Sequence, residues 1–276
     1  MPVLPITKIS PIPQSIIYSF ALDCLLMLPA RERLIVALDV SSSVKAQKIV
    51  SSLGDAVQTY KVGMQLYTAE GPQIVRELVA SGKGVFLDLK YHDIPNTVAA
   101  AVREGAQLGV SMLTVHACGG TKMLQAATEA ARSSIGRVGA DGVVRPQILA
   151  VTVLTSMNAE DLNQTGVQGS LADLVLHLAS IALAAGCDGV VSSAHEVRNL
   201  RAKLGNEFLA VTPGVRPAGA AHGDQARVVT PAEAIAAGAT HIVVGRPITA
   251  AADRAAAVES VLRDIRGSEF AESRTK

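Results

Sequence analysis

The sequence predicts an α/β protein, built as a single (β/α)₈ TIM barrel with a short N-terminal extension. Hydrophobic residues make up 49% of the 276-residue chain, but only 3% are aromatic and tryptophan is absent. The core must therefore consist of alanine, valine, leucine and isoleucine, a composition typical of parallel strands covered by helices. From residue 34 onward, a short β-branched run, an alanine-rich amphipathic stretch and a glycine recur in that order. Eight such repeats in about 240 residues match a barrel of this class, whose usual length is about 250 residues.

Each repeat supplies one strand, and most of the intervening stretches supply a helix. The strand candidates are short apolar runs that span residues 34–39, 57–61, 84–89, 112–116, 147–154, 189–192, 208–212 and 241–245. The helix candidates are amphipathic, several end at a glycine, and they span residues 44–53, 71–81, 97–108, 121–133, 172–185, 194–204 and 231–237. A doubly wound sheet uses the same units, but no GxGxxG motif follows the first strand. The barrel is therefore favoured.

The barrel domain is expected to span residues 31–268, between an N-terminal extension at 1–30 and a C-terminal tail at 269–276. The most apolar stretch, residues 16–28, is interrupted by Ser19 and Asp23 and is too short to span a bilayer. It is followed by a weak signal-peptide cleavage site. We therefore expect the extension to be disordered or a misassigned start, and we expect no membrane partner.

Charge and cysteine content argue against two further classes of protein, those that bind nucleic acid and those that hold a structural metal. The formal net charge is +1, from 25 basic and 24 acidic residues, so the basic surface of a nucleic-acid-binding protein is not expected. The three cysteines, Cys24, Cys118 and Cys187, fall in no CxxC or cysteine–histidine cluster. A reduced, cytoplasmic protein without a structural metal is the simplest interpretation.

Charged residues end the first three predicted strands. Asp39 ends the first strand, Lys61 the second, and Asp88 and Lys90 the third. Asp88 and Lys90 are two residues apart, so on an extended strand they point to the same side, the inside of the barrel mouth. A purely structural ion network is the alternative, but burying four ionisable groups is costly and such clusters mark functional sites. Because carboxylates neighbour each lysine, we expect ammonium groups that donate protons or clamp anions rather than a Schiff-base amine.

The loops after the seventh and eighth strands predict a phosphate site. Their sequences are TPGVR at residues 212–216 and VGRP at residues 244–247. Glycine allows close approach of a ligand to the backbone, and arginine offers a fork for phosphate oxygens. Barrels of this class often bind phosphate at these two loops, although ordinary turns with solvated arginines are the alternative.

Other polar residues near the strand ends leave alternatives open. His116 could line the site or be a core histidine, and His92 could be a general acid or a supporting residue. Thr155 and Ser156 could bind a ligand or cap the next segment. Gln225 lies in a long loop of the kind that often serves as a lid.

The run DLKYHDIPNT at residues 88–97 resembles the signature of the orotidine 5′-phosphate decarboxylase family, in its bacterial form. The resemblance extends over residues 34–263 and includes the motifs LDV, YKVG, TVLTS, TPGVR, GDQARVVTP and VVGRPI. DxKxxD alone is shared with sugar-phosphate enzymes of the same superfamily. IPNT and TPGVR narrow the match to the decarboxylases, which make UMP in pyrimidine biosynthesis.

The resemblance implies a cofactor-free decarboxylation in which Lys90 protonates C6 of the pyrimidine. Lys90 would be flanked by Asp88, by Lys61 and by Asp93 of the partner subunit in a homodimer with shared active sites. The remaining implied contacts are Asp39 and Thr97 to ribose, Thr155 and Ser156 to the pyrimidine, and Arg216, Gln225, Gly245 and Arg246 to the phosphate. No metal, flavin, pyridoxal phosphate or thiamine is implied.

Two other functions remain as alternatives. In a magnesium-dependent sugar-phosphate decarboxylase or aldolase, Asp88 would bind Mg²⁺, but Lys61 and Lys90 would crowd that ion with positive charge. A non-catalytic nucleotide-phosphate binding protein would explain the two glycine-arginine loops and leave the aspartate-lysine array without a purpose.

Overall fold

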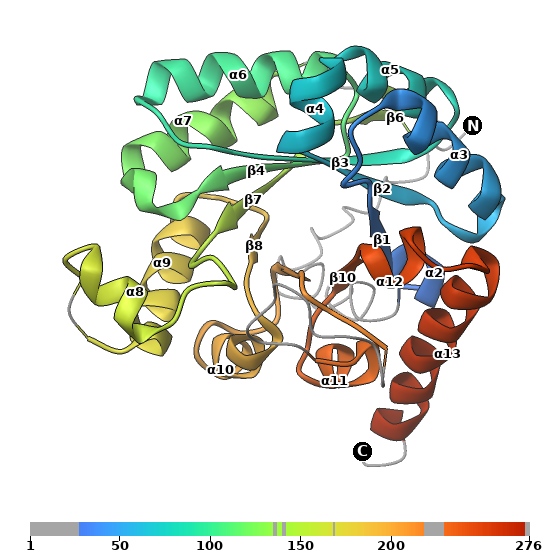
Figure 1. The fold of residues 1–276 in the computed structure, drawn as a ribbon. Helices are drawn as coiled ribbons and strands as arrows, with labels where there is room; N and C mark the ends of the chain where they lie inside the picture. Colours follow the sequence, from blue (N-terminus) through green and yellow to red (C-terminus); the bar gives the residue numbers. More distant parts are fainter. Residues whose placement is uncertain (1–27, 135–136, 140–141, 168, 218–228, 274–276) are drawn as a thin grey trace, which may run out of the picture.

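The computed structural model describes residues 28–134, 137–139, 142–167, 169–217 and 229–273. Eight parallel strands close into a barrel in the order β1-β10-β9-β8-β7-β4-β3-β2, and helices surround it (Figure 1). This arrangement confirms the predicted TIM barrel. The barrel strands are β1 (Leu34–Ala37), β2 (Thr59–Gly63), β3 (Gly84–Tyr91), β4 (Met112–His116), β7 (Gln147–Val151), β8 (Gly189–Val191), β9 (Leu209–Thr212) and β10 (His241–Val244).

The helices follow the strands along the chain. They are α2 (Ala30–Arg33), α3 (Ser43–Leu53), α4 (Met64–Glu70), α5 (Gln73–Ala80), α6 (Pro95–Gln107), α7 (Gly120–Ser133), α8 (Ala159–Gln164), α9 (Leu171–Ala184), α10 (Ala194–Leu204), α11 (Pro231–Ala236), α12 (Arg246–Thr249) and α13 (Arg254–Ser273). An antiparallel pair, β5 (Arg137–Gly139) and β6 (Gly142–Val144), stands outside the barrel and was not expected from the sequence.

Alternate residues of each strand face two separate apolar layers. In β1, Leu34 and Val36 pack in the larger cluster shared with the helices, whereas Ile35 and Ala37 belong to a smaller cluster. Every member of the smaller cluster comes from a barrel strand, so this cluster fills the barrel interior. The two-residue period of a strand therefore decides which side chains can reach the mouth of the barrel.

Several element boundaries differ from the predicted ones, and glycine or proline accounts for some of these differences. The helix predicted at 71–81 is the shorter helix α5, because Gly71 ends the preceding helix α4 with a φ of 64° and Pro72 precedes α5, whereas α4 itself was not predicted. Helix α6 begins at Pro95, two residues earlier than predicted, because proline is well tolerated at the first helical position. Strand β7 ends at Val151 rather than at residue 154.

The two ends of the barrel domain meet beside β10. Arg33, in α2, donates hydrogen bonds to the carbonyl oxygens of Ala239 at 2.7 Å and Thr240 at 3.2 Å. Helix α13 contacts α2, α3 and α11, and it runs through Ser273 (Figure 1). The predicted boundary at residue 268 therefore falls inside this helix. The extension predicted at 1–30 lies outside the described residues up to residue 27. Within the described ranges, no helix is both long enough and apolar enough to cross a membrane.

His241 is a buried histidine at the start of β10, and its Nδ1 lies 3.0 Å from the Thr240 hydroxyl. Burial, with a smaller contribution from the nearby positive charge of Arg33, lowers the pKa of His241 to about 4. The folded protein therefore holds a neutral imidazole. The unfolded chain binds a proton on this residue below pH ~6.5. Stability from the neutral ring is complete above pH ~6.5 and is lost progressively as the pH falls toward 4.

We expect His241→Asn to weaken the acid sensitivity of folding. Between pH 6.5 and 4 the wild-type protein should lose up to about 1.4 kcal/mol per pH unit more than the variant. Urea unfolding at pH 8 and pH 5 measures the difference, and His177→Asn, at an exposed position of α9, is the matched control. An equal pH dependence in His241→Asn and wild type would contradict the account.

Candidate active site

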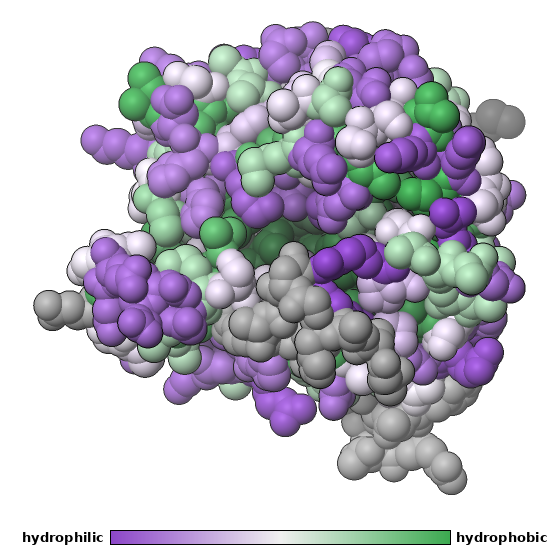
Figure 2. All heavy atoms as spheres, viewed as in Figure 1, coloured by the Kyte–Doolittle hydropathy of each residue, from purple (hydrophilic) through white to green (hydrophobic). Residues whose placement is uncertain are grey.

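A cleft of about 470 Å³ opens where the barrel strands end at their carboxyl termini. The region after β1 and strands β2 and β3 contribute the charged residues Asp39, Lys61, Asp88 and Lys90, and the loops after β9 and β10 contribute the two glycine-arginine pairs. Apolar side chains of the barrel interior, including Phe86 and Val151, also line the cleft. Figure 2 shows a hollow on this face with hydrophobic residues at its base and hydrophilic residues along its rim.

The four charged residues form a continuous chain of opposite charges. Lys61 Nζ lies 3.0 Å from Asp39 Oδ1 and 3.6 Å from Asp88 Oδ2. Lys90 Nζ donates to the other Asp88 oxygen, Oδ1, at 2.9 Å. The Asp88 side chain is only 13% exposed, whereas that of Asp39 is 55% exposed, so the central carboxylate depends on the two lysines for compensation.

Strand β3 directs its side chains as the two-residue alternation predicts. Phe86, Asp88 and Lys90 line the cleft, whereas Leu87 and Leu89 pack in the outer layer against the helices. The strand is irregular near its end: its pairing with β4 shifts register between Leu87 and Tyr91. Among the described non-glycine residues, only Lys90 has a positive φ, of 54°. This local distortion near the end of β3 was not predicted.

The loops after β9 and β10 reach the cleft together. Gly214 and Arg216 come from the first loop, Gly245 and Arg246 from the second, and all four line the cleft. Arg216 is buried, and its backbone N–H donates to the Val229 carbonyl at 2.9 Å, which fixes the base of the first loop. Gln225, predicted at the phosphate, lies outside the described residues.

The segment after β7 contributes part of its predicted contacts. Thr155 lines the cleft together with Val153 and Leu154, whereas Ser156 is exposed and is not among the residues that line it. The apolar pair Val153 and Leu154 could contact one flat ring face, and the Thr155 hydroxyl could bind a polar edge of the same ring.

Asp93 and Thr97 do not line the cleft of their own chain. Both are exposed, and the Asp93 carboxylate accepts a hydrogen bond at 2.6 Å from the backbone N–H of Ile94. Thr97 lies in the first turn of α6. The structure therefore does not bring these two predicted residues into the cleft of their own chain.

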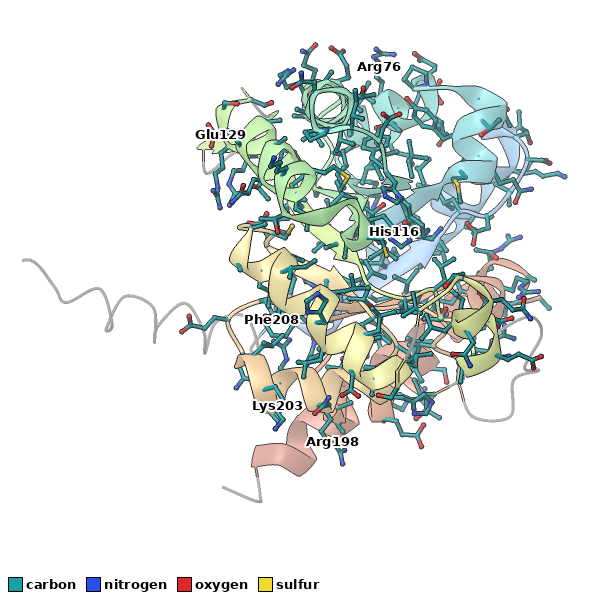
Figure 3. All side chains as sticks on the ribbon, turned by 90° about the vertical axis from the view of Figure 1, so that its left-hand side faces the viewer. Arg76, His116, Glu129, Arg198, Lys203 and Phe208 are labelled. Atoms are coloured by element: carbon teal, nitrogen blue, oxygen red, sulfur yellow. The ribbon has the colours of Figure 1, made fainter. Side chains whose placement is uncertain are left out.

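The two histidines near the site form a stacked pair. The ring centroids of His92 and His116 are 5.5 Å apart, with an angle of 29° between the planes. Burial, the neighbouring His92 and then Lys90 lower the pKa of His116, whose buried Nδ1 has no hydrogen-bond partner among the described residues. Figure 3 shows His116 in the interior, while Arg76 and Lys203 lie at the periphery. Neither histidine is among the residues that line the cleft.

Sequence reasoning missed several residues of this region, the apolar pair Val153 and Leu154 among them. Phe86 and Thr114 are placed by strand alternation, two residues before Asp88 and His116 respectively, so the signal was present. Gln65 lines the cleft from α4, a helix that the sequence did not reveal.

The charges of the site suit an anion better than a metal ion. Among the residues the structure describes, no group of three or more histidine, cysteine, aspartate or glutamate side chains could hold a metal. Both Asp88 oxygens already face lysine ammonium groups. A divalent cation at Asp88 would therefore meet the positive charge of Lys61 and Lys90.

Comparison with known proteins agrees with this geometry. The family described as Orotidine 5′-phosphate decarboxylase / HUMPS family matches residues 32–261. The chain belongs to this family. A relative from Halorhodospira halophila named orotidine 5′-phosphate decarboxylase is 51% identical over 237 residues, covering 86% of this chain and 97% of the relative. A relative of the same name from Moorella thermoacetica is 48% identical over 237 residues, covering 86% of this chain and 93% of the relative.

A solved structure supports the same assignment. The crystal structure of orotidine 5′-phosphate decarboxylase from Lactobacillus acidophilus superposes with a TM-score of 0.75 at 40% sequence identity. The match covers 84% of this chain and 98% of that one. Membership in the Orotidine 5′-phosphate decarboxylase / HUMPS family thus rests on sequence and on fold.

The charged chain leaves little room beside Gly63, the last residue of β2. A Cβ atom at Gly63 would lie 2.8 Å from Lys61 Nζ and 3.3 Å from Asp39 Oδ1. We expect Gly63→Ala to displace the Lys61 ammonium and lengthen its 3.0 Å contact with Asp39. The backbone angles of Gly63, φ −95° and ψ −177°, suit alanine, so the melting temperature should change little.

Crystal structures of Gly63→Ala and the wild-type protein measure this displacement. Gly267→Ala, where no atom lies within 4 Å of the added Cβ, is the control and should leave the Lys61–Asp39 contact unchanged. A Gly63→Ala structure with the same Lys61–Asp39 distance as wild type would contradict the predicted crowding.

Proposed function

We propose that this protein converts orotidine 5′-phosphate to UMP and CO₂, without a metal or organic cofactor. The observation that carries the proposal is the Lys90 ammonium, held 2.9 Å from Asp88 in a cleft that also contains two arginine-bearing loops. Membership in the family and the printed names of relatives at 48–51% identity support this substrate over others.

The chemistry requires a cation at one carbon atom. When the bond between C6 and the carboxylate breaks, its electron pair remains at C6 in an sp² orbital that is perpendicular to the ring π system. Ring resonance cannot absorb this pair, so electrostatic stabilisation must come from the protein. The Lys90 ammonium attracts the developing negative charge and then donates its proton to C6, and the resulting neutral amine regains a proton from water.

Asp88 contributes by its position and its charge. It holds the Lys90 ammonium through Oδ1, and its negative charge disfavours a second carboxylate nearby. A substrate carboxylate beside Asp88 is destabilised in the ground state and relieved when it leaves as neutral CO₂. Lys61 balances Asp88 from the opposite side and keeps the site from repelling the substrate altogether.

Substrate binding is assigned to the remaining predicted site residues. Asp39 binds a ribose hydroxyl, and Thr155 with Ser156 binds the pyrimidine. Arg216, Gln225, Gly245 and Arg246 bind the phosphate. The two guanidinium groups suit a phosphate dianion. Contacts to the phosphate, remote from C6, hold the ring against Lys90 and so contribute to the rate.

The rate enhancement cannot come from Lys90 alone. Each tenfold increase in rate requires the activation free energy to fall by about 1.36 kcal/mol, and one preorganised hydrogen-bond donor contributes about 3–4 kcal/mol. The charged chain, the ground-state effect of Asp88 and the remote phosphate contacts together must supply the remainder. This division is consistent with a cleft that contains both the charged residues and the two arginine-bearing loops.

An assay with two arms tests the function. Loss of the orotate absorbance is followed with purified protein and orotidine 5′-phosphate, in the presence and absence of a chelator. Equal rates in both arms support the proposal. Loss of activity in chelator would favour a magnesium-dependent sugar-phosphate enzyme, and UMP binding without turnover would favour a non-catalytic nucleotide-binding protein.

We expect Lys90→Ala to abolish turnover while the fold and UMP binding survive. Removal of a positioned general acid typically lowers the rate roughly 10²–10⁴-fold, and the apolar layers of the barrel are untouched. Steady-state kinetics and calorimetric UMP binding measure the two properties, with Lys122→Ala, at an exposed position of α7, as the control. Turnover of Lys90→Ala within about tenfold of wild type would contradict its role as proton donor.

We further propose a homodimer in which each active site is shared. Asp93 and Thr97 are exposed and are not among the residues that line the cleft of their own chain. Beside them Ile94 is 67% exposed, and Met64, after the neighbouring strand β2, is 56% exposed, which is unusual for large apolar side chains. Burial of this surface against a second copy would bring Asp93 of the partner subunit to Lys90 and Thr97 of the partner subunit to the ribose.

Mixing two inactive variants tests the shared site. We expect Asp93→Ala and Lys90→Ala each to be nearly inactive as homodimers. After verified subunit exchange in equal amounts, half the dimers combine both variants, and each of these holds one intact site. Roughly a quarter of wild-type activity should return for random pairing in a closed two-fold dimer. Exchange that restores no activity would place Asp93 in its own subunit.

We also propose that the protein acts in the cytoplasm and binds neither nucleic acid nor membrane. The net charge of +1 supports the absence of a nucleic-acid partner. Cys118 and Cys187, within the described part of the chain, are free thiols, as is usual in a reducing compartment.

A further inference from the structure

We infer that Thr114, in β4, is a positioning residue that sets the direction of the Lys90 ammonium. The inference rests on the proposed function, because it assigns how the proton donor of that reaction is held. Thr114 is fully buried and is not among the residues that line the cleft, so it has no route to the substrate. Its contacts are with Asp88 and with the backbone of Lys90.

The irregularity in β3 gives Thr114 an unusual position. Leu87 pairs with Leu113 of β4, and the next pair is Tyr91 with Val115. Thr114 alone therefore lies opposite the three residues 88–90. Such a bulge leaves backbone groups without a ladder partner and redirects side chains, and bulges often occur beside active sites.

The Thr114 hydroxyl satisfies the groups that the bulge leaves open. The backbone N–H of Lys90 donates to Thr114 Oγ1 at 2.8 Å. The same hydroxyl donates to Asp88 Oδ1 at 3.1 Å. The Thr114 hydroxyl thus accepts a hydrogen bond from the Lys90 backbone and donates one to the Asp88 carboxylate, which in turn holds the Lys90 ammonium. Both the backbone and the side chain of Lys90 are therefore linked to Thr114.

The backbone of Lys90 needs this support. Its φ of 54° lies in the left-handed region, where the backbone of a residue other than glycine is strained. Strained conformations persist only where surrounding contacts impose them. In a regular strand Lys90 would adopt extended angles, and the direction of its side chain would change. The Thr114 hydrogen bonds oppose that relaxation and keep Lys90 Nζ 2.9 Å from Asp88.

Two variants of Thr114 and one remote control test the inference. Thr114→Val keeps the shape and removes the hydroxyl, and Thr114→Ser keeps the hydroxyl. Thr128→Val is the matched control, because Thr128 is also buried and its hydroxyl donates to the Gln125 and Ala185 carbonyls, and because it is not among the residues that line the cleft. Measured properties are kcat for orotidine 5′-phosphate, the Kd of UMP, the melting temperature and the Lys90 backbone angles in crystals.

We expect Thr114→Val to lower kcat roughly 10²-fold, as misplacement of a reacting group by about 1 Å can do, while the Kd of UMP stays near wild type. Thr114→Ser should restore most of kcat, and Thr128→Val should leave kcat unchanged although both valine variants lose some stability. In crystals of Thr114→Val, Lys90 should leave the left-handed region.

Other results would contradict the positioning role of Thr114. Wild-type kcat in Thr114→Val, or an unchanged positive φ at Lys90 in that variant, would overturn the positioning role. If Thr114→Val does not fold, Thr114→Ala takes its place, and failure of both to fold beside an intact Thr114→Ser would show that the hydroxyl is structural. A wild-type protein that does not decarboxylate orotidine 5′-phosphate would overturn the proposed function, while the Lys90 backbone angles would still decide the positioning role.

Discussion

The alternation of charge along Asp39, Lys61, Asp88 and Lys90 is the constraint on which the site depends. Each inner member of this chain lies between two groups of opposite charge, at 2.9–3.6 Å. Asp88 is nearly buried, so loss of either lysine would leave its carboxylate poorly compensated, and loss of Asp88 would bring two ammonium groups together. Neighbouring parallel strands β1, β2 and β3 all end at the same rim, and this topology lets residues 22 to 27 positions apart make such contacts.

The remainder of the barrel complements this charged side. The loops after strands β9 and β10 present glycine and arginine to the same cleft, which apolar residues of the barrel interior also line. A ligand that fits must therefore carry an anionic end, an apolar or ring-like middle, and an end that can lie beside both carboxylate and ammonium groups. This division separates recognition from chemistry, so that energy from binding a distant phosphate can hold the reacting carbon against the ammonium. Thr114 supports this arrangement from outside the cleft, because its hydrogen bonds fix the backbone from which that ammonium projects.

Much of the fold and the charged residues of the cleft could be predicted from the sequence. Composition and the repeat of strand, helix and glycine were enough for the barrel, and the two-residue alternation correctly placed Asp88 and Lys90 inside and Leu87 and Leu89 outside. Helix α4 was missed because its seven residues are too few to show a clear helical periodicity. The bulge in β3 was missed because it depends on pairing with β4 and on the Thr114 hydroxyl, which are tertiary contacts that no local pattern encodes. Asp93 and Thr97 could be assigned only through the family resemblance, since their proposed site is formed by a second chain.

The most direct test of the account is a crystal structure of the wild-type protein with UMP bound. The account predicts that Lys90 Nζ lies ~3–3.5 Å from C6 of the ring, the separation of reacting atoms in a near-attack arrangement. The phosphate should contact Arg216 and Arg246. A complex in which C6 points away from Lys90, or in which the phosphate occupies the charged chain of Asp39, Lys61 and Asp88, would contradict the central claim that this chain is built to protonate C6.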